Sequence, residues 1–433
     1  LTTKIDNKVE KITGELHIDH PANKSGLENY PEYPIFTSRE NSFIYFDEPS
    51  IQNGVYDRNE FYFELFPFTI DSLDNFTREA LSLEGTFVSA EILPPLELEM
   101  TLRPDNSLGF YLATPENGLP VYQGKGTFYA DIEMSSRGLH GYGSLDYLTS
   151  TTWSDDFLFH PDSLLTESRR FLEREQKSPD SYPYVENDIT DIRWYPAKNV
   201  MHIDRIENVF TMYEDSIHFG GNLALSPSGL TGEGVLGLPD ARFESDEFRF
   251  EARDYSADSA GIQLKAPAAK PYAWMTNDVH IRVDLEKRQG DFQANEDYTL
   301  ISFPENLYET RLDQMTWFMD RREVSMTQQK RLAENDVNIG IDSLTTNAPT
   351  YLSKHPKQDS LNFVAPTAVF DYMSKDLYAF DVPFIAVGDA FVFPNKGEVL
   401  IKEEARIETL RNAKLLANHQ SRYHMLRKAS LNI

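Results

Sequence analysis

The sequence predicts a mainly β protein in which repeated sheet units form a solenoid-like or stacked-sheet array, with one or two short helices. Three observations lead to this prediction. One segment recurs at a fixed offset, aromatic residues cluster in short bursts between turn residues, and 433 residues are more than one compact core usually holds. Short bursts bounded by Gly, Pro and Asn are typical of strands, because buried helices need longer apolar segments.

The recurring segment runs without a gap at an offset of 91 residues, so that Gly138 corresponds to Gly229. The first copy contains Ser135, Gly138, Leu139, Gly141, Gly143, Leu145, Ser154, Asp155, Phe157 and Phe159, and the second contains Ser226, Gly229, Leu230, Gly232, Gly234, Leu236, Ser245, Asp246, Phe248 and Phe250. Glycine at alternate positions permits a β-bulge, a tight bend or close stacking of neighbouring backbones. The Phe pair at i and i+2 points to one side of a strand, so we expect both pairs in a core.

Stretches rich in Pro, Lys, Ser or Gly divide the chain into four predicted regions. These are an N-terminal β region over 1–122, a tandem β-repeat region over 123–265, a β region with a short helix over 266–345 and a C-terminal β region over 346–433. Looser versions of the unit begin at Phe87, Phe292 and Tyr351. Because their spacing varies, loops of different length are favoured over a short strict repeat.

Two segments have a helical pattern. Residues 162–177 carry Leu164, Leu165, Phe171 and Leu172 between charged residues, with Asp162 or Ser163 as the cap, and residues 308–334 carry Leu312, Met315, Phe318 and Met319. The stretch 398–418 combines period-two spacing with a helix-like composition. We predict strands there, because the preceding residues 379–399 have a clear strand pattern.

The composition limits the possible partners. The chain has 41 basic and 69 acidic residues and a net charge of −28, which repels phosphate backbones and argues against nucleic acid. It contains no cysteine, which excludes disulfides and thiolate sites. No stretch approaches the roughly 18 apolar residues that cross a bilayer. The chain begins at Leu1 without a signal peptide, so we expect a mature product or a segment of something longer.

Several motifs follow one another in a set order. Residues 84–165 contain Glu-Gly-Thr-Phe-Val-Ser-Ala, Tyr-Gln-Gly-Lys-Gly-Thr-Phe, Gly-Leu-His-Gly-Tyr-Gly-Ser-Leu and Asp-Asp-Phe-Leu-Phe-His-Pro-Asp-Ser, and Val-Gly-Asp-Ala-Phe-Val-Phe-Pro follows at 387–394. This order resembles that of long uncharacterised Bacteroidetes cell-envelope proteins built of β repeats. The resemblance brings no activity and no site residues. It implies an exported location, periplasmic or at the cell surface, and a segment of a larger polypeptide.

A second feature agrees with that resemblance. The tripeptide Asp-Ser followed by Leu, Ile or Ala begins at Asp71, Asp162, Asp215, Asp258, Asp342 and Asp359. It resembles the O-glycosylation acceptor pattern of the same bacterial group. Chance is the alternative, because Asp and Ser are common in this chain and also cap helices.

No convergent catalytic set is visible, and we predict no catalytic or cofactor-binding residue. The best paired carboxylates are Asp155 with Asp156 and Asp246 with Glu247. Sequence neighbours on a strand point to opposite faces, so neither pair alone can flank a sugar as the two carboxyls of a glycosidase do. We interpret them as solvated turn acids, with a Ca²⁺ site as the weaker alternative. His17, Asp19 and His20 are the densest metal-ligand cluster, but a third ligand on one face is missing.

The sequence therefore favours a non-enzymatic cell-envelope or surface protein that acts as a scaffold or interaction surface. Its partner would be another protein or a second copy, joined through sheet edges. One alternative is a β-groove for a lipid or another apolar chain, lined by residues 361–368 and 379–393. The other is a carbohydrate-active enzyme on a β-solenoid, with Asp155 or Asp246 in its site.

Overall fold

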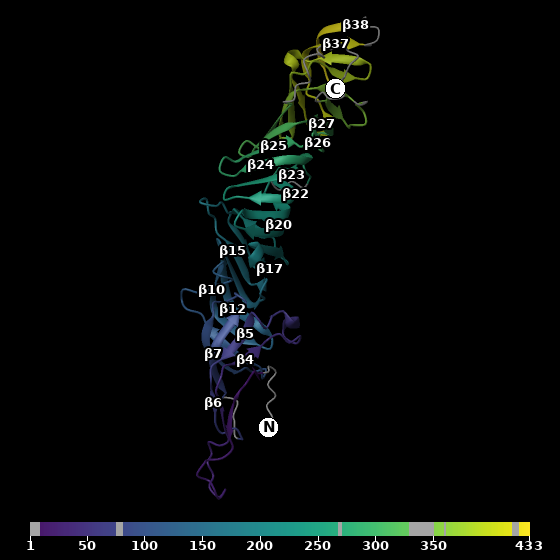
Figure 1. The fold of residues 1–433 in the computed structure, drawn as a ribbon. Helices are drawn as coiled ribbons and strands as arrows, with labels where there is room; N and C mark the ends of the chain where they lie inside the picture. The colour runs from purple at the N-terminus through teal and green to yellow at the C-terminus, as the bar shows by residue number, and fades with distance from the viewer. Residues whose placement is uncertain (1–8, 75–80, 267–270, 329–349, 359–360, 418–423) are drawn as a thin grey trace. The chain divides into compact units, whose positions relative to one another are not determined.

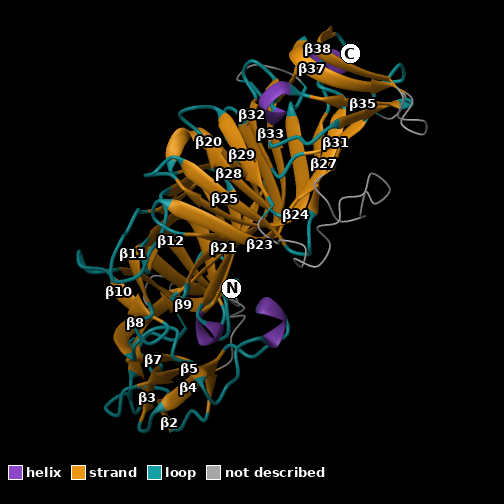
Figure 2. Cartoon of the chain, turned by 90° about the horizontal axis from the view of Figure 1, so that it is seen from above, coloured by secondary structure: helices purple, strands orange, loops and turns teal. Residues whose placement is uncertain are grey.

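The computed structural model describes residues 9–74, 81–266, 271–328, 350–358, 361–417 and 424–433. Strands and the turns between them make up these residues, as the orange arrows of Figure 2 show. The prediction of a mainly β protein is confirmed. Within the described ranges the helical elements are single 3₁₀ turns, namely η1 (Gln52–Gly54), η3 (Pro196–Lys198), η5 (Asn395–Gly397) and η6 (Glu403–Ala405).

The chain forms two compact units, and each is described by itself. Unit 1 comprises residues 1–174, 185–208 and 224–228, and unit 2 comprises residues 175–184, 209–223 and 229–433. In both units a run of antiparallel strands divides in two where one long strand pairs with two different partners along its length.

Unit 1 begins as a meander of antiparallel strands. In order of pairing they are β1 (Val9–Glu10), β4 (Ser42–Tyr45), β5 (Phe61–Leu65), β7 (Ser82–Ser89), β8 (Leu96–Leu102), β9 (Leu108–Ala113), β11 (Gly126–Ser135), β12 (Gly138–Tyr147) and β13 (Ser150–Phe159). The short β10 (Leu119–Val121) also pairs with β11. Alternate residues of β5 and β7 are buried, and the Phe61, Phe87 and Phe110 rings lie edge to face at 5.2 and 4.9 Å.

The sheet of unit 1 divides at β13. Residues Phe157–Phe159 pair with β14 (Leu164–Ser168), whereas residues Ser150–Trp153 pair with β15 (Arg170–Glu173). One branch continues from β14 to β17 (Thr190–Tyr195) and β18 (Val200–Arg205). The other continues from β15 to β16 (Val185–Asn187).

A small separate sheet in unit 1 consists of β2 (Gly14–His17), β3 (Ile35–Ser38) and β6 (Thr69–Ile70). All four residues of β2 are exposed, including Leu16 at 57%. This sheet therefore contributes little to the core of the unit.

Unit 2 contains β19 (Phe210–Met212) and residues 214–223 of β20 (Glu214–Ser226). They are followed by β21 (Gly229–Gly237), β22 (Ala241–Phe250), β23 (Asp254–Leu264) and β24 (Trp274–Asp284), each paired with the next from β21 onward (Figure 1). The sheet divides at β24, where Val279–Asp284 pair with β25 (Gln289–Ala294) and Met275 and Thr276 pair with β26 (Thr299–Phe303).

The two branches of unit 2 continue to its C-terminal end. The first runs from β25 through β28 (Gln314–Phe318), β29 (Glu323–Thr327), β32 (Thr367–Asp371) and β33 (Asp376–Phe380) to β36 (Val399–Ile401). The second runs from β26 through β27 (Tyr308–Leu312), β30 (Thr350–Ser353), β31 (Asn362–Val364), β34 (Ile385–Val387), β35 (Ala390–Phe393) and β37 (Leu410–Ala417) to β38 (His424–Leu431).

The branches of unit 2 enclose a core between them. Phe303 of one branch lies edge to face against Phe370 of the other at 5.0 Å. The buried Asn306 donates to the carbonyl of Lys375 across the same gap at 2.7 Å, and Lys375 in turn pairs with Glu305. The strands predicted over 398–418 are present as β36 and β37, and residue 418 lies outside the described residues.

Both predicted helices are wrong wherever the structure describes them. Residues 162–177 form β14 and β15, and residues 308–328 form β27, β28 and β29; residues 329–334 lie outside the described residues. In each segment two of these strands, β14 and β15 or β27 and β28, bury alternate residues and are separated by a single residue. At this point the alternation of buried and exposed residues shifts by one position. Apolar residues on the two strands therefore recur at spacings that also occur in a helix.

Candidate functional site

The two recurring segments adopt the same local structure. In β12 and β13 the register shifts between Gly141 and Gly143, and in β21 and β22 it shifts between Gly232 and Gly234. The second glycine of each pair has φ of +144°. A Cβ atom at Gly143 would overlap the Tyr129 carbonyl oxygen of the adjacent strand. Of the three arrangements that glycine at alternate positions permits, the structure has the bulge in both segments.

The Phe pairs that follow the bulges are buried, as predicted. Phe157 and Phe159 both pack edge to face on Phe128, at 5.3 Å each. Phe248 and Phe250 pack on Phe219 in the same way, at 6.0 and 5.2 Å.

The paired acids are the extra residues of these bulges. Asp155 and Asp156 together oppose the single residue Tyr142, because Gly141 pairs with Phe157 and Gly143 pairs with Ser154. Both acids are exposed, so the expectation that they point to opposite faces of a regular strand is wrong. A bulge bends the strand and leaves the two residues unpaired, which turns both toward solvent. Asp246 and Glu247 are exposed in the same manner in unit 2.

The acids contact bases rather than each other. Asp155 pairs with Arg169 at 3.1 Å, and Glu247 lies 3.5 Å from Arg249. In both bulges a serine hydroxyl caps the turn. Ser154 accepts from the Asp156 N–H, Ser245 accepts from the Glu247 N–H, and each hydroxyl donates to a backbone carbonyl of the neighbouring strand at 2.7 Å.

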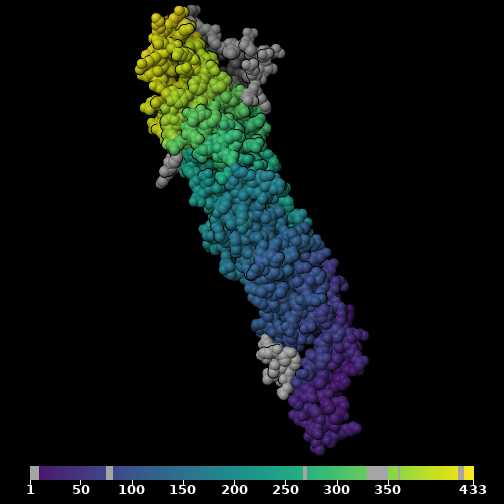
Figure 3. All heavy atoms as spheres, turned by 90° about the vertical axis from the view of Figure 1, so that its left-hand side faces the viewer, coloured from purple at the N-terminus to yellow at the C-terminus, as the bar shows by residue number. Residues whose placement is uncertain are grey.

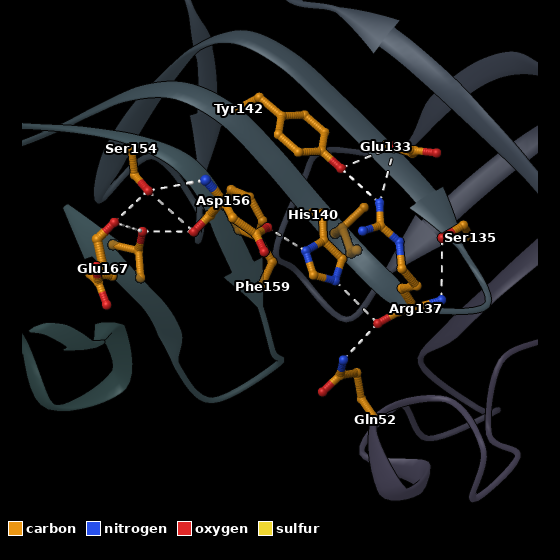
Figure 4. A network of polar contacts seen from close by, with 12 residues as sticks. Gln52, Glu133, Ser135, Arg137, His140, Tyr142, Ser154, Asp156, Phe159 and Glu167 are labelled. Atoms are coloured by element: carbon orange, nitrogen blue, oxygen red, sulfur yellow. Dashed lines mark hydrogen bonds and ion pairs between the residues drawn. The ribbon is translucent and has the colours of Figure 1, made fainter. Parts of the chain in front are cut away.

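A network of polar contacts in unit 1 is centred on His140 (Figure 4). Its Nδ1 lies 2.6 Å from Asp156 Oδ1, and its Nε2 lies 3.2 Å from the Arg137 carbonyl oxygen, which also accepts from Gln52. His140 is 7% exposed. The Asp156 carboxylate and the Arg137 carbonyl thus hold the ring from both of its nitrogens.

A second part of the same network surrounds Glu133 (Figure 4). Tyr142 donates to Glu133 at 3.1 Å and accepts from the Arg137 guanidinium at 3.0 Å, while Arg103 pairs with the other Glu133 oxygen at 3.0 Å. Burial and the Glu133 carboxylate raise the pKa of Tyr142 above its ordinary value, so the hydroxyl remains a donor.

This arrangement is suited to holding strands together rather than to proton transfer. A general base needs a ring nitrogen with a free lone pair within reach of a nucleophile. Here Asp156 and a backbone carbonyl engage both nitrogens of His140, and the nearby Ser154 donates to the carbonyl of Glu167 instead. The network joins η1, β11, β12 and β13 of unit 1.

The side chains of the other candidates, His17, Asp19 and His20, do not converge on one point, although the His20 N–H donates to Asp19 Oδ1 at 2.8 Å. His17 lies 3.7 Å from Glu15, whereas His20 stacks on Tyr30 at 4.3 Å and Asp19 accepts from Asn23. Across the described ranges, no group of three or more His, Asp or Glu side chains is arranged to hold a metal ion. The proposed groove segments have their alternate residues in the core, including Phe363, Ala379 and Val392.

The Asp-Ser tripeptides have different surroundings. Ser163 is buried, Ser216 and Ser259 are exposed, and Ser72 is half-buried. The tripeptides that begin at Asp342 and Asp359 lie outside the described residues.

Two features escaped the sequence analysis. One is Glu173 of β15, which is fully buried. The other is a surface pocket of about 360 Å³ in unit 2, lined by Glu214, Ser216, Ile217, Leu238, Pro239, Asp240, Leu285, Arg288, Met319, Asp320 and Arg322. Neither belongs to a local motif, because the residues that surround Glu173 and those that line the pocket come from separate parts of the sequence.

No family model matches this chain, and no curated protein is significantly similar to it in sequence. Within the part of the chain that the structure describes, no helix has the length and apolar character needed to cross a bilayer.

Proposed function

We propose that this chain is a non-enzymatic interaction scaffold of the bacterial cell envelope, which extends its sheet by pairing with an acidic strand of a partner. In this proposal the two bulged motifs, β12 with β13 and β21 with β22, are copies of one stacked building block. The envelope location is supported by the sequence motifs that resemble Bacteroidetes envelope proteins. The observation that carries the proposal is the open edge of β38.

β38 is the last strand of its branch. Among the described strands it pairs only with β37, so its other edge presents backbone N–H and C=O groups with no strand beside them. Six of its eight residues are exposed, including Met425 and Leu426 at 49% and 55%. The C-terminal residues, yellow in Figure 3, lie at the molecular surface. Such an edge is a template for strand addition.

The charge of this hairpin selects the partner. β37 and β38 carry Arg411, Lys414, Arg427 and Lys428 and no acidic residue, in a chain whose net charge is −28. Basic side chains on an open edge discourage pairing with another basic edge and favour an acidic one. The partner strand is therefore expected to alternate apolar and acidic residues, whether it comes from a second copy or from another protein.

Site-specific photo-crosslinking tests the proposal. We place a benzophenone amino acid at Leu426 or Ser430 of β38, and at the exposed Tyr298 as a control. The expected product joins β38 to an acid-rich peptide, which mass spectrometry identifies as part of this chain or of a partner. The double charge reversal Arg427→Glu with Lys428→Glu should abolish it, whereas Lys357→Glu with Lys396→Glu, which changes the net charge equally, should not.

Two results would contradict the proposal. One is a yield at β38 no higher than at Tyr298. The other is a set of adducts that contains lipid but no peptide, which would favour the apolar-groove alternative.

A further inference from the structure

The pocket of unit 2 is built from turns that lie far apart in sequence. Residues 238–240 join β21 to β22, residues 285–288 join β24 to β25, and residues 319–322 join β28 to β29. Backbone bonds fix these turns to their surroundings, because Tyr372 N–H donates to the Arg322 carbonyl at 3.2 Å and Met319 N–H donates to the Arg288 carbonyl at 3.1 Å. The pocket is thus a feature of the folded sheet, and its volume lies at the small end of the range for ligand sites.

A buried chain of hydrogen bonds orients the acid in this pocket. Trp317 Nε1 donates to the Tyr372 hydroxyl at 3.2 Å, and Tyr372 donates to Asp240 Oδ2 at 2.7 Å. Trp317 and Tyr372 are both fully buried. Burial and the neighbouring carboxylate raise the pKa of Tyr372 well above its ordinary value, so its hydroxyl remains a donor to Asp240. This leaves Asp240 Oδ1 as the oxygen that can accept from a ligand.

The two arginines of the pocket differ in their bonding. Arg288 is held by Asp320 through its Nε. Arg322 is exposed, and within the described residues its side chain makes no ion pair or hydrogen bond. Its guanidinium is therefore available as a bidentate donor to an anionic group.

The charges of the pocket point to one class of ligand. Its three acids and two arginines would repel a simple anion, whereas Arg322 would be left unused by a simple cation. A zwitterion satisfies both, since its ammonium group can donate to Asp240 and its anionic group can accept from Arg322. Ile217, Leu238 and Met319 supply an apolar wall for the rest of such a molecule.

We propose that this pocket binds a small zwitterion with an ammonium group, a carboxylate or phosphate, and a short apolar part. The free amino acid and the ethanolamine phosphate headgroup of a lipid share this chemistry. The proposal does not depend on strand pairing at β38.

Ligand-observed NMR and calorimetry with the full chain test it. L-leucine and O-phosphoethanolamine are the probes, and 4-methylpentanoate and isopentylamine are analogues that each lack one charge of leucine. We expect at least one probe to bind saturably. If leucine binds, it should bind at least about tenfold more tightly than either analogue, because each lost charged hydrogen bond costs at least that factor.

Neighbouring arginines give a matched pair of variants. Arg322→Gln should weaken probe binding at least about tenfold. Arg321→Gln, which removes the arginine next to it that lies 3.7 Å from Glu323 and outside the pocket, should have no effect. Asp240→Asn should remove the preference for leucine over 4-methylpentanoate. Tyr372→Phe tests the positioning of Asp240, and it should weaken leucine binding while leaving that of 4-methylpentanoate unchanged.

The proposal is overturned if neither probe binds up to about 20 mM, if both analogues match leucine, or if the Arg321 and Arg322 variants behave alike. Binding of O-phosphoethanolamine without leucine would assign the pocket to the phosphate-bearing source. The reverse would assign it to amino acids.

Discussion

Replacing Glu173 with glutamine should remove a large part of the pH dependence of stability in unit 1. Glu173 pairs with Ser150 of β13 and Val185 of β16, and its side chain is fully buried. Neither carboxyl oxygen has a hydrogen-bond partner among the described residues. Burial raises the pKa of Glu173 from 4.5 to about 8, and the nearby Thr149 hydroxyl and Arg174 guanidinium offset only part of that rise.

The sign follows from proton binding in the two states. Between pH 4.5 and pH 8 the folded protein keeps a proton on Glu173 that the unfolded chain has released. Stability therefore falls as pH rises through this window, and below it the group contributes no penalty. Between pH 5 and pH 9 the loss amounts to about 4 kcal/mol, since each unit of pKa difference corresponds to about 1.4 kcal/mol.

Urea denaturation from pH 5 to pH 9, combined with hydrogen exchange of peptides that cover β13 and β15, measures this effect. Glu173→Gln should lose less stability than the unmodified protein as pH rises. Glu167→Gln, at an exposed glutamate on the neighbouring β14, should leave the pH dependence unchanged. Parallel pH profiles for the unmodified protein and Glu173→Gln would refute the reasoning.

Three further predictions concern the same units. Tyr56→Phe should destabilise unit 1 by about 2 kcal/mol in urea denaturation, because the Tyr56 hydroxyl donates to the Phe159 carbonyl at 2.8 Å and accepts from Leu139 N–H at 3.0 Å. Tyr62→Phe is the control, and an equal loss of stability in the two variants would contradict this prediction. Gly234→Ala should lower the free energy of unfolding by about 2 to 4 kcal/mol, since Gly234 has φ of +144° and a Cβ there would meet the Gly220 carbonyl oxygen at 2.5 Å. The control Gly220→Ala, whose Cβ would have its nearest contact at 3.5 Å, should cost less than half as much. Similar melting temperatures for the two variants would contradict the prediction. Asp156→Asn should lower the free energy of unfolding by about 1 kcal/mol, because it weakens the hydrogen bond to His140. Asp155→Asn should lower it by less than about 0.5 kcal/mol, because the ion pair of Asp155 is exposed to solvent. A larger loss of stability for Asp155→Asn than for Asp156→Asn would contradict this prediction.

The sequence predicted those parts of the fold that depend on local backbone conformation and on the alternation of apolar residues. Glycines at alternate positions predicted a bulge, a tight bend or close stacking of backbones, and Gly141, Gly143, Gly232 and Gly234 form a bulge in each segment. The strand pattern near the C-terminus was also correct. The helices failed because the bend at Arg169 changes the phase between two short strands, so that Leu164 and Phe171 fall on a helical spacing.

The candidate sites could be predicted only in part. The acids of the bulges were found because they recur with the glycines. The contact between Tyr372 and Asp240 spans 132 residues, and no local pattern indicates it. Burial of Glu173 was not predicted either, since a glutamate followed by an arginine is ordinarily a surface residue.

The two bulged motifs differ in a way that bears on function. At the offset of 91 residues, Glu133, Arg137, His140 and Tyr142 correspond to Ala224, Ser228, Thr231 and Glu233. The polar network around His140 is therefore specific to the first motif, whereas the glycines, the serine caps and the buried Phe pairs occur in both. A catalytic site carried by a structural unit would be expected to keep its polar residues when that unit recurs. Here the shared residues are those that shape and pack the strands, while the charged side chains vary with their local surroundings. This difference supports the proposal of an interaction scaffold over that of a catalytic unit.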